Sequence, residues 1–187
     1  MANHVNTYIR FTGLTPETVS KLKERFEPIE FGTSIGAFFT NVEYTHDFFF
    51  EHIGSKWCTL EDYDIGDDYA DINVTSAWSY PNKLVESLNQ FVAETQEEFK
   101  TTTTYEDEMP NFFGAEIYLD GDLQDCVEYD DEEIDDLLCE TDEKFAELYQ
   151  RYSEDDDEEA EEEMYDLKNE LIWEMISEKQ CELLDGY

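Results

Sequence analysis

The sequence has few basic residues. Only 11 Lys and Arg stand against 50 Asp and Glu, which gives a formal net charge of -39. A surface that binds phosphates needs clustered Lys and Arg, so this balance argues against direct binding of nucleic acid or of an anionic membrane. We therefore expect basic proteins to be the natural partners of this chain.

Long apolar runs are also missing. No window of 18 apolar residues occurs, so the sequence predicts no transmembrane span. The opening MANHVNTYIRF has no basic region followed by an apolar run, so it does not resemble a signal peptide. We expect a cytoplasmic location.

Patterns typical of metal sites and disulfides are absent. The cysteines are scattered without a C-x-x-C pair, which favours reduced and mostly packed thiols. They are Cys58, Cys126, Cys139 and Cys181. The segment DGDLQD from Asp120 to Asp125 fails the calcium-loop pattern because Asp125 stands where glycine is required. The histidines His4, His46 and His52 have no metal-ligand spacing, and solvated side chains are the simpler interpretation.

Motifs of common enzyme classes are missing too. The sequence has no Gly-x-Ser-x-Gly element, no P-loop and no Gly-x-Gly-x-x-Gly element. A catalytic carboxylate pair cannot be picked out of 50 acids by sequence alone. We therefore expect a protein that is not an enzyme and that needs no cofactor and no metal.

What the sequence does contain is a dense acidic region at residues 120–187, which holds 29 of the 50 acids and only four basic residues. Its apolar residues recur at helical spacing, and the pattern predicts two helices at about 131–152 and 159–184. The first apolar stripe comprises Ile134, Leu137, Leu138, Phe145, Leu148, Tyr149 and Tyr152, and the second comprises Met164, Leu167, Leu171, Met175, Ile176 and Leu183.

The charge density of these predicted helices is close to that of DNA. Each helix carries nine acids. At about 1.5 Å of rise per residue, the pair presents about one negative charge per 2 Å of axis, against about one per 1.7 Å in duplex DNA. The apolar stripes argue against a disordered acidic tail, because such tails contain few apolar residues. Two other interpretations remain open, a merely solvated helical surface and adaptation to a saline cytoplasm.

The first two thirds of the chain show alternating strand and helix patterns. Residues 4–12 alternate as a half-buried strand, and Thr15 with Pro16 marks the start of a helix that ends near Pro28. A helix is also predicted from Pro81 to about Thr95. Further strands are predicted at 57–65, 69–78, 97–106 and 112–119. Residues 30–52 receive no assignment, and 122–130 can be strand or linker.

This order predicts an α+β fold with a ferredoxin-like antiparallel sheet that has helices on one face, followed by a C-terminal acidic helical hairpin. We divide the chain accordingly into a ferredoxin-like domain at 1–121 and the hairpin at 122–187.

Three segments of the first domain carry a resemblance to a known family. They are IGSKW at 53–57, TSAWSYP at 75–81 and TTYEDEMPNFFGAEIYLDG at 103–121. They resemble the W-G-T-K-W, T-A-W-S-P-P and E-x-G-x-x-F-x-G elements of the YubB-like ferredoxin-like domain family of phages and plasmids. The resemblance spans residues 3–121, about two thirds of the chain. It implies a fold and a mobile-element origin, and no catalytic residues.

The sequence departs from that family pattern at several positions. Ile53 stands in place of the first tryptophan, and Tyr80 stands in place of the first of two prolines. Met109 and Pro110 replace the glycine region before Phe113. Trp57, Trp78 and Tyr80 could line a groove or could simply pack at strand ends.

These observations lead to a functional hypothesis: a phage-type acidic protein that mimics nucleic acid and inhibits a basic host DNA- or RNA-binding protein in the host cytoplasm. The alternative is a structural or assembly protein that forms a homodimer through its C-terminal helices. The residues expected to contact the host protein are the outer acids Asp131, Glu132, Asp135, Asp155, Asp156, Glu159, Glu162 and Glu163.

Overall fold

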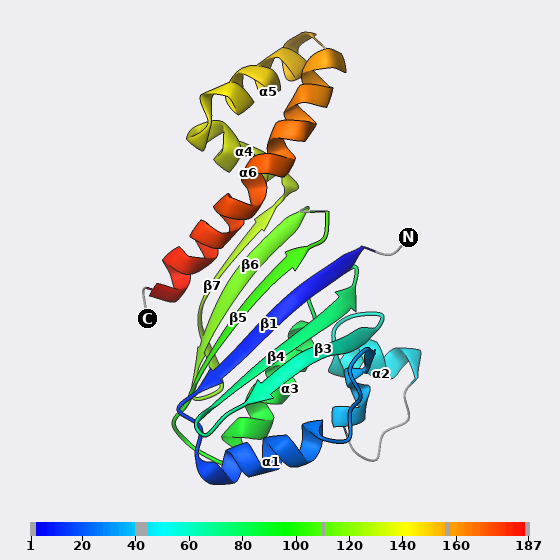
Figure 1. Ribbon diagram of the computed structural model, residues 1–187, viewed down its shortest axis with the longest axis vertical. Helices are drawn as coiled ribbons and strands as arrows, with labels where there is room; N and C mark the ends of the chain where they lie inside the picture. Colours follow the sequence, from blue (N-terminus) through cyan, green and yellow to red (C-terminus); the bar gives the residue numbers. More distant parts are fainter. Residues whose placement is uncertain (1–2, 40–44, 110, 156–157, 186–187) are drawn as a thin grey trace.

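A computed structural model of the chain describes residues 3–39, 45–109, 111–155 and 158–185, and within these residues an antiparallel sheet of seven strands forms the centre of the molecule (Figure 1). The strand order is β2-β3-β4-β1-β5-β6-β7. The α+β class and the antiparallel sheet expected from the sequence are confirmed. The sheet is larger than the four strands of a ferredoxin-like β-α-β-β-α-β unit.

The elements have the following bounds. The strands are β1 (His4–Thr12), β2 (Thr33–Ser34), β3 (Cys58–Ile65), β4 (Tyr69–Ala77), β5 (Lys100–Asp107), β6 (Phe112–Leu119) and β7 (Asp122–Asp130). The helices are α1 (Pro16–Phe26), the 3-10 helix η1 (Ile35–Phe38), α2 (His46–His52), α3 (Asn82–Ala93), α4 (Asp131–Thr141), α5 (Glu143–Asp155) and α6 (Glu158–Asp185).

One face of the sheet packs against α1 and α3. Alternate residues of β1 point to this face and are buried, because successive side chains of a strand project to opposite sides. The hydroxyl of Thr15 accepts a hydrogen bond from the N–H of Thr18, and Pro16 occupies the first turn, so α1 begins where the sequence predicts. Ile9, Ile72, Leu22, Phe26 and Leu88 lie in the resulting core.

The opposite face is covered only in part. Tyr105 of β5 projects toward the face that packs against α1 and α3, so its neighbour Glu106 projects to the opposite face. Phe113 of β6 pairs with Glu106 and therefore also projects to this opposite face. There it packs with residues of α4, α5 and α6, and Figure 1 shows α6 crossing in front of β6 and β7 while α3 lies behind the sheet. The rest of this face, over β1, β3 and β4, remains open in the same view.

The C-terminal third differs from the sequence prediction in two ways. The single helix expected at 131–152 is wrong, because Asp142 takes an extended conformation with φ -129° and ψ 115° and separates α4 from α5. Residues 122–130, left open by the sequence, form β7, which pairs with β6 and carries the sheet past residue 121. The unassigned segment 30–52 contains β2, η1 and α2.

The expectation of mostly packed thiols is also wrong. The four cysteines, all within the described residues, are free, and only Cys58 is buried. Burial raises the pKa of the Cys58 thiol. Cys126 and Cys181 are exposed, and Cys139 is half-buried.

Gly114 offers a test of the packing between β5, β6 and β7. A Cβ atom there would lie 2.4 Å from the ring of Tyr105 and 2.6 Å from the carbonyl oxygen of Val127. We expect Gly114→Ala to lower the free energy of unfolding by about 1–3 kcal/mol, since backbone on one side cannot yield. Urea denaturation measures this.

A matched control is Gly66→Ala. The atoms nearest to its new Cβ belong to the side chain of Tyr69, a half-buried ring, and not to backbone. If the two substitutions destabilise the protein equally, the packing described for Gly114 is wrong.

Candidate protein interface in the acidic cap

Helices α4, α5 and α6 form a folded unit at one end of the sheet, here called the acidic cap. Asp130 and Glu133 form a capping box that starts α4: the N–H of Glu133 donates to Asp130 Oδ1 at 3.0 Å, and the N–H of Asp130 donates to Glu133 Oε2 at 3.1 Å. Because β7 runs directly into this box, the position of the cap is set by the sheet.

The turn between α4 and α5 depends on Asp142. Its N–H donates to the carbonyl of Leu138 and closes α4, while its carboxylate accepts from the N–H of Phe145 at 2.8 Å and starts α5. One residue thus ends a helix and caps the next. Sequence periodicity missed this break because the apolar spacing continues across it.

The apolar stripes of the three helices meet in a second core, here called the cap core. Its side chains are 0 to 6% exposed. Phe113 of β6 belongs to it, and Phe113 stacks on Tyr129 of β7 with ring centroids 4.9 Å apart. The helical residues are Ile134, Leu138, Phe145, Ile172, Met175 and Ile176. The acidic cap is therefore a packed scaffold.

Lys168 joins α6 to α4. Its Nζ lies 2.6 Å from Asp135 Oδ1 and 2.9 Å from Asp131 Oδ1. Burial lowers the pKa of the Lys168 ammonium, but its hydrogen bonds and ion pairs with Asp135 and Asp131 outweigh that effect and raise the pKa above its ordinary value. Two of the acids expected to contact a partner thus hold the cap together.

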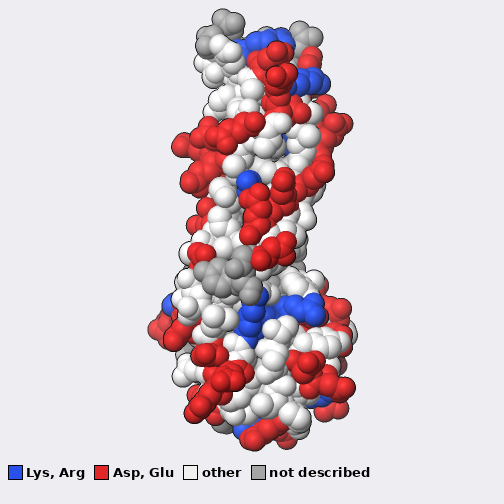
Figure 2. Space-filling model, turned by 90° about the vertical axis from the view of Figure 1, so that its left-hand side faces the viewer, with Lys and Arg blue, Asp and Glu red and all other residues white. Residues whose placement is uncertain are grey.

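Most of the remaining acids on the cap face solvent. Figure 2 shows acidic side chains spread over the cap, in the upper half of that view. The exposed acids of the described residues are Asp131, Glu132, Glu133, Asp136, Glu140, Glu143, Glu147, Glu161, Glu162, Glu163, Asp166, Glu170, Glu174, Glu178, Glu182 and Asp185. They project from fixed helical positions over an apolar interior.

The structure places the predicted contact residues in different settings. Glu132, Glu162 and Glu163 are exposed on α4 and α6, as a contact surface requires. Asp131 is exposed but pairs with Lys168, and Asp135 is mostly covered. The side chains of Asp155 and Glu159 lie outside what the structure describes, although α5 and α6 include both residues, and Asp156 lies outside the described residues altogether.

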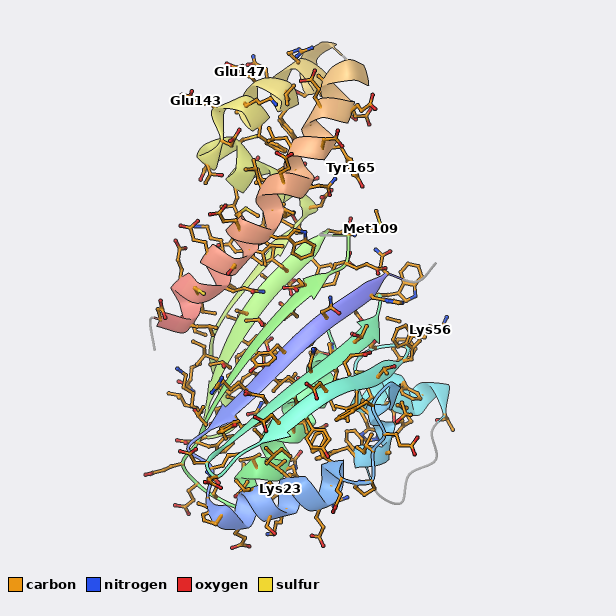
Figure 3. All side chains as sticks on the ribbon, in the orientation of Figure 1. Lys23, Lys56, Met109, Glu143, Glu147 and Tyr165 are labelled. Carbon is orange, nitrogen blue, oxygen red and sulfur yellow. The ribbon has the colours of Figure 1, made fainter. Side chains whose placement is uncertain are left out.

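A pocket that the sequence did not predict lies beside the acidic cap. It has a volume of about 420 Å³ and lies where the turn between β5 and β6 meets α4 and α6. Met109 of the turn and Tyr165 of α6 both line it, and Figure 3 labels these two side chains on the same side of the molecule. Sequence periodicity could only indicate that Tyr165 falls off the apolar stripe of its helix.

A network of tyrosines and glutamates on the face of the sheet that packs against α1 and α3 was also missed. The hydroxyl groups of Tyr80 and Tyr118 donate to Glu116 Oε2 at 2.5 and 2.7 Å, and that of Tyr105 donates to Glu128 Oε2 at 2.7 Å. Tyr80 stacks on Tyr105 with centroids 3.9 Å apart. Desolvation by burial, and then the neighbouring carboxylates, raise the pKa of all three tyrosines.

The aromatic residues considered as a groove therefore behave differently from one another. Tyr80 packs at the end of β4 within this network, and the ring of Trp57 meets that of His4 edge-on at 5.3 Å. Trp78 is 55% exposed and has a φ of 70°, which is unusual for a bulky residue. The Trp78 N–H donates to the Asn3 carbonyl at 3.0 Å.

The described residues contain neither a membrane-spanning helix nor a metal-binding cluster. No helix there combines the length and apolar character needed to cross a bilayer. Across the same ranges, no group of three or more His, Cys, Asp or Glu side chains is arranged to hold a metal ion.

Comparison of the chain with protein-family models, with curated proteins and with solved structures found no match in any of the three.

Replacing Lys168 tests the link between α4 and α6. We expect Lys168→Met to lower the free energy of unfolding by about 1–3 kcal/mol, because Asp131 and Asp135 would be left close together without an ammonium. Thermal unfolding and amide hydrogen exchange of α4 measure the loss. Lys179→Met, which removes only an ion pair to Glu182 on the same helix, is the control and should cost less. Equal effects of the two would contradict the proposed link.

Alkaline titration tests the tyrosine network. Because the folded pKa values of Tyr80, Tyr105 and Tyr118 are raised, their contribution to stability is complete below the unfolded pKa of about 10 and is lost as pH rises above it. Absorbance at the tyrosinate band should show these residues ionising only as the protein unfolds. The urea-unfolded chain, in which all 12 tyrosines titrate normally, is the reference. Titration of every tyrosine while the fold is intact would refute the network.

Proposed function

We propose that this chain is a phage-type acidic binding protein that mimics nucleic acid and inhibits a basic host DNA- or RNA-binding protein. The observation that carries the proposal is the display of exposed carboxylates on three helices that share a buried apolar core. Proteins of defence, restriction, recombination or transcription are the candidate targets. The proposed activity is binding, without catalysis.

The length of α6 supports this proposal. With 28 residues, α6 extends over about 42 Å. Duplex DNA of that length carries about 25 phosphate charges, counting both strands, whereas α6 alone carries 11 acids, so the acids of α4 and α5 are part of the proposed surface. Carboxylates held on such a scaffold would displace phosphates from Lys and Arg, with fast electrostatic steering and an affinity that falls as salt screens the charges.

The internal arrangement of the sheet supports the fold part of the hypothesis. The elements β1-α1-β3-β4-α3-β5 follow the β-α-β-β-α-β pattern of a ferredoxin-like unit, with strand order β3-β4-β1-β5. We infer a ferredoxin-like unit extended by β2, β6 and β7. This inference agrees with the resemblance of residues 3–121 to the YubB-like family and with a mobile-element origin.

The alternative is a structural or assembly protein that dimerises through α4–α6. The exposure of Trp173, at 45%, favours it. Ile172 and Ile176, which a four-helix dimer would need for packing against a partner helix, are instead buried in the cap core. Sedimentation in molar salt separates the two proposals, because an apolar dimer persists there and an electrostatic complex dissociates.

The mimicry proposal is tested by capture from a bacterial host lysate. The immobilised protein should retain basic nucleic-acid-binding proteins at low salt and release them to duplex DNA or to high salt. Neutralising four exposed cap acids should weaken capture by about tenfold at low salt. The cap variant carries Glu132→Gln, Glu143→Gln, Glu162→Gln and Glu163→Gln.

The control has the same net charge. It carries Glu24→Gln, Glu27→Gln, Glu97→Gln and Glu98→Gln, at exposed positions around α1 and before β5. Capture that is lost equally in both variants would show only a general effect of net charge. Capture that duplex DNA does not displace would exclude mimicry.

A further inference from the structure

The pocket beside the acidic cap gathers large apolar side chains at the surface. Met109, Tyr165 and Trp173 line it and are 55%, 57% and 45% exposed. They come from two elements far apart in sequence, the turn between β5 and β6 and helix α6. Aromatic residues and methionine are enriched at the centres of protein interfaces, and concave apolar surfaces are where single anchoring side chains bind. The shape and lining of this pocket suit an apolar anchor.

The charges around the pocket define what must flank that anchor. Four carboxylates line it, against one ammonium, that of Lys168. Lys168 already pairs with Asp131 and Asp135, so it leaves the rim strongly negative. An acidic rim attracts cations and repels acidic segments. Glu161, exposed on α6, and Glu108, beyond the end of β5, lie on this rim.

The surface continues from this pocket onto the open face of the sheet. A second hollow of about 530 Å³ lies over β1, β3 and β4, and Glu108 lines both hollows. The His4 N–H donates to Glu108 Oε1 at 3.1 Å, which fixes the carboxylate between them. Trp57 lies in the second hollow among Asn and Thr side chains. An extended segment seated in the pocket would therefore have a polar, acidic track to follow.

We propose that the pocket formed by Met109, Tyr165 and Trp173 is the anchor site for a partner segment in which one apolar side chain is flanked by Lys or Arg. The apolar side chain enters the pocket, and the flanking cations face Glu108 and Glu161. The inference rests on the proposed function, because it names the kind of basic segment that the target presents. The anchor differs from the mimicry proposal in the force that drives binding. Burial of an apolar side chain contributes affinity that high salt does not weaken, whereas salt screens attraction between charges.

The test uses two short lysine peptides, one with a central Phe and one with Ala in its place, titrated into the full chain by calorimetry. We expect the Phe peptide to bind at least about tenfold more tightly than the Ala peptide, with the difference retained at high salt. Met109→Ser combined with Tyr165→Ser should abolish that difference. Both side chains are exposed, so thermal unfolding should change little.

The control combines Phe31→Ser and Leu123→Ser, two apolar side chains of similar exposure, 57% and 49%, away from the pocket. It should keep the full difference between the peptides. Equal affinity for the two peptides, or a difference that survives the pocket substitutions, would overturn the anchor site.

The outcomes also separate this inference from the mimicry proposal. Loss of the peptide difference alongside DNA-competed capture would refute the anchor and leave mimicry standing. A peptide difference that depends on the pocket, without any capture of nucleic-acid-binding proteins, would support the anchor and refute mimicry.

Discussion

Repulsion among carboxylates is the constraint that the rest of this structure must satisfy. A net charge of -39 on 187 residues opposes compaction, and the opposition is greatest in the C-terminal third. Two features counter it. The cap core supplies apolar burial that depends little on ionic conditions, and Lys168 of α6 forms ion pairs with Asp131 and Asp135, two acids of α4. Most of the other acids of the cap whose side chains the structure describes are exposed, where water reduces their mutual repulsion.

Strand β6 links the two halves of the molecule. Its Tyr118 faces the core built by α1 and α3, while its Phe113 faces the cap core. Gln180 of α6 reinforces this arrangement by donating from Nε2 to the carbonyl oxygens of Gly114 at 3.1 Å and Tyr105 at 3.3 Å. Because these contacts are buried and directional, the helices that carry the acids cannot slide along the sheet without losing them. The sheet thus fixes the orientation of the charged surface.

Sequence patterns predicted those parts of the fold that depend on local periodicity. β1 and β6 have the predicted bounds, and α1 begins at Pro16 because Thr15 and Pro16 form a recognisable start signal. The helix break at Asp142 was not predicted, because the apolar spacing continues across it. Only the backbone conformation changes there, from helical to extended. The tyrosine network and the pocket at Met109 escaped prediction for another reason. They join side chains from β5, β6, β7, α6 and the segment after β4, and no local pattern encodes such long-range neighbours. The sequence predicts that many acids of the C-terminal third are exposed. It does not predict that Asp131 and Asp135 pair with Lys168, because that contact depends on how α4 and α6 pack together.

The course of α6 has a practical consequence for handling the protein. The helix starts at the far tip of the cap and ends at Asp185 beside the sheet, so its two ends lie on different parts of the molecule (Figure 1). A fluorophore, biotin or solid support attached at the last turn of α6 would therefore sit well away from α5 and the tip of the cap. Single-molecule or sensor-chip formats built on that end would leave the charged tip facing the solution.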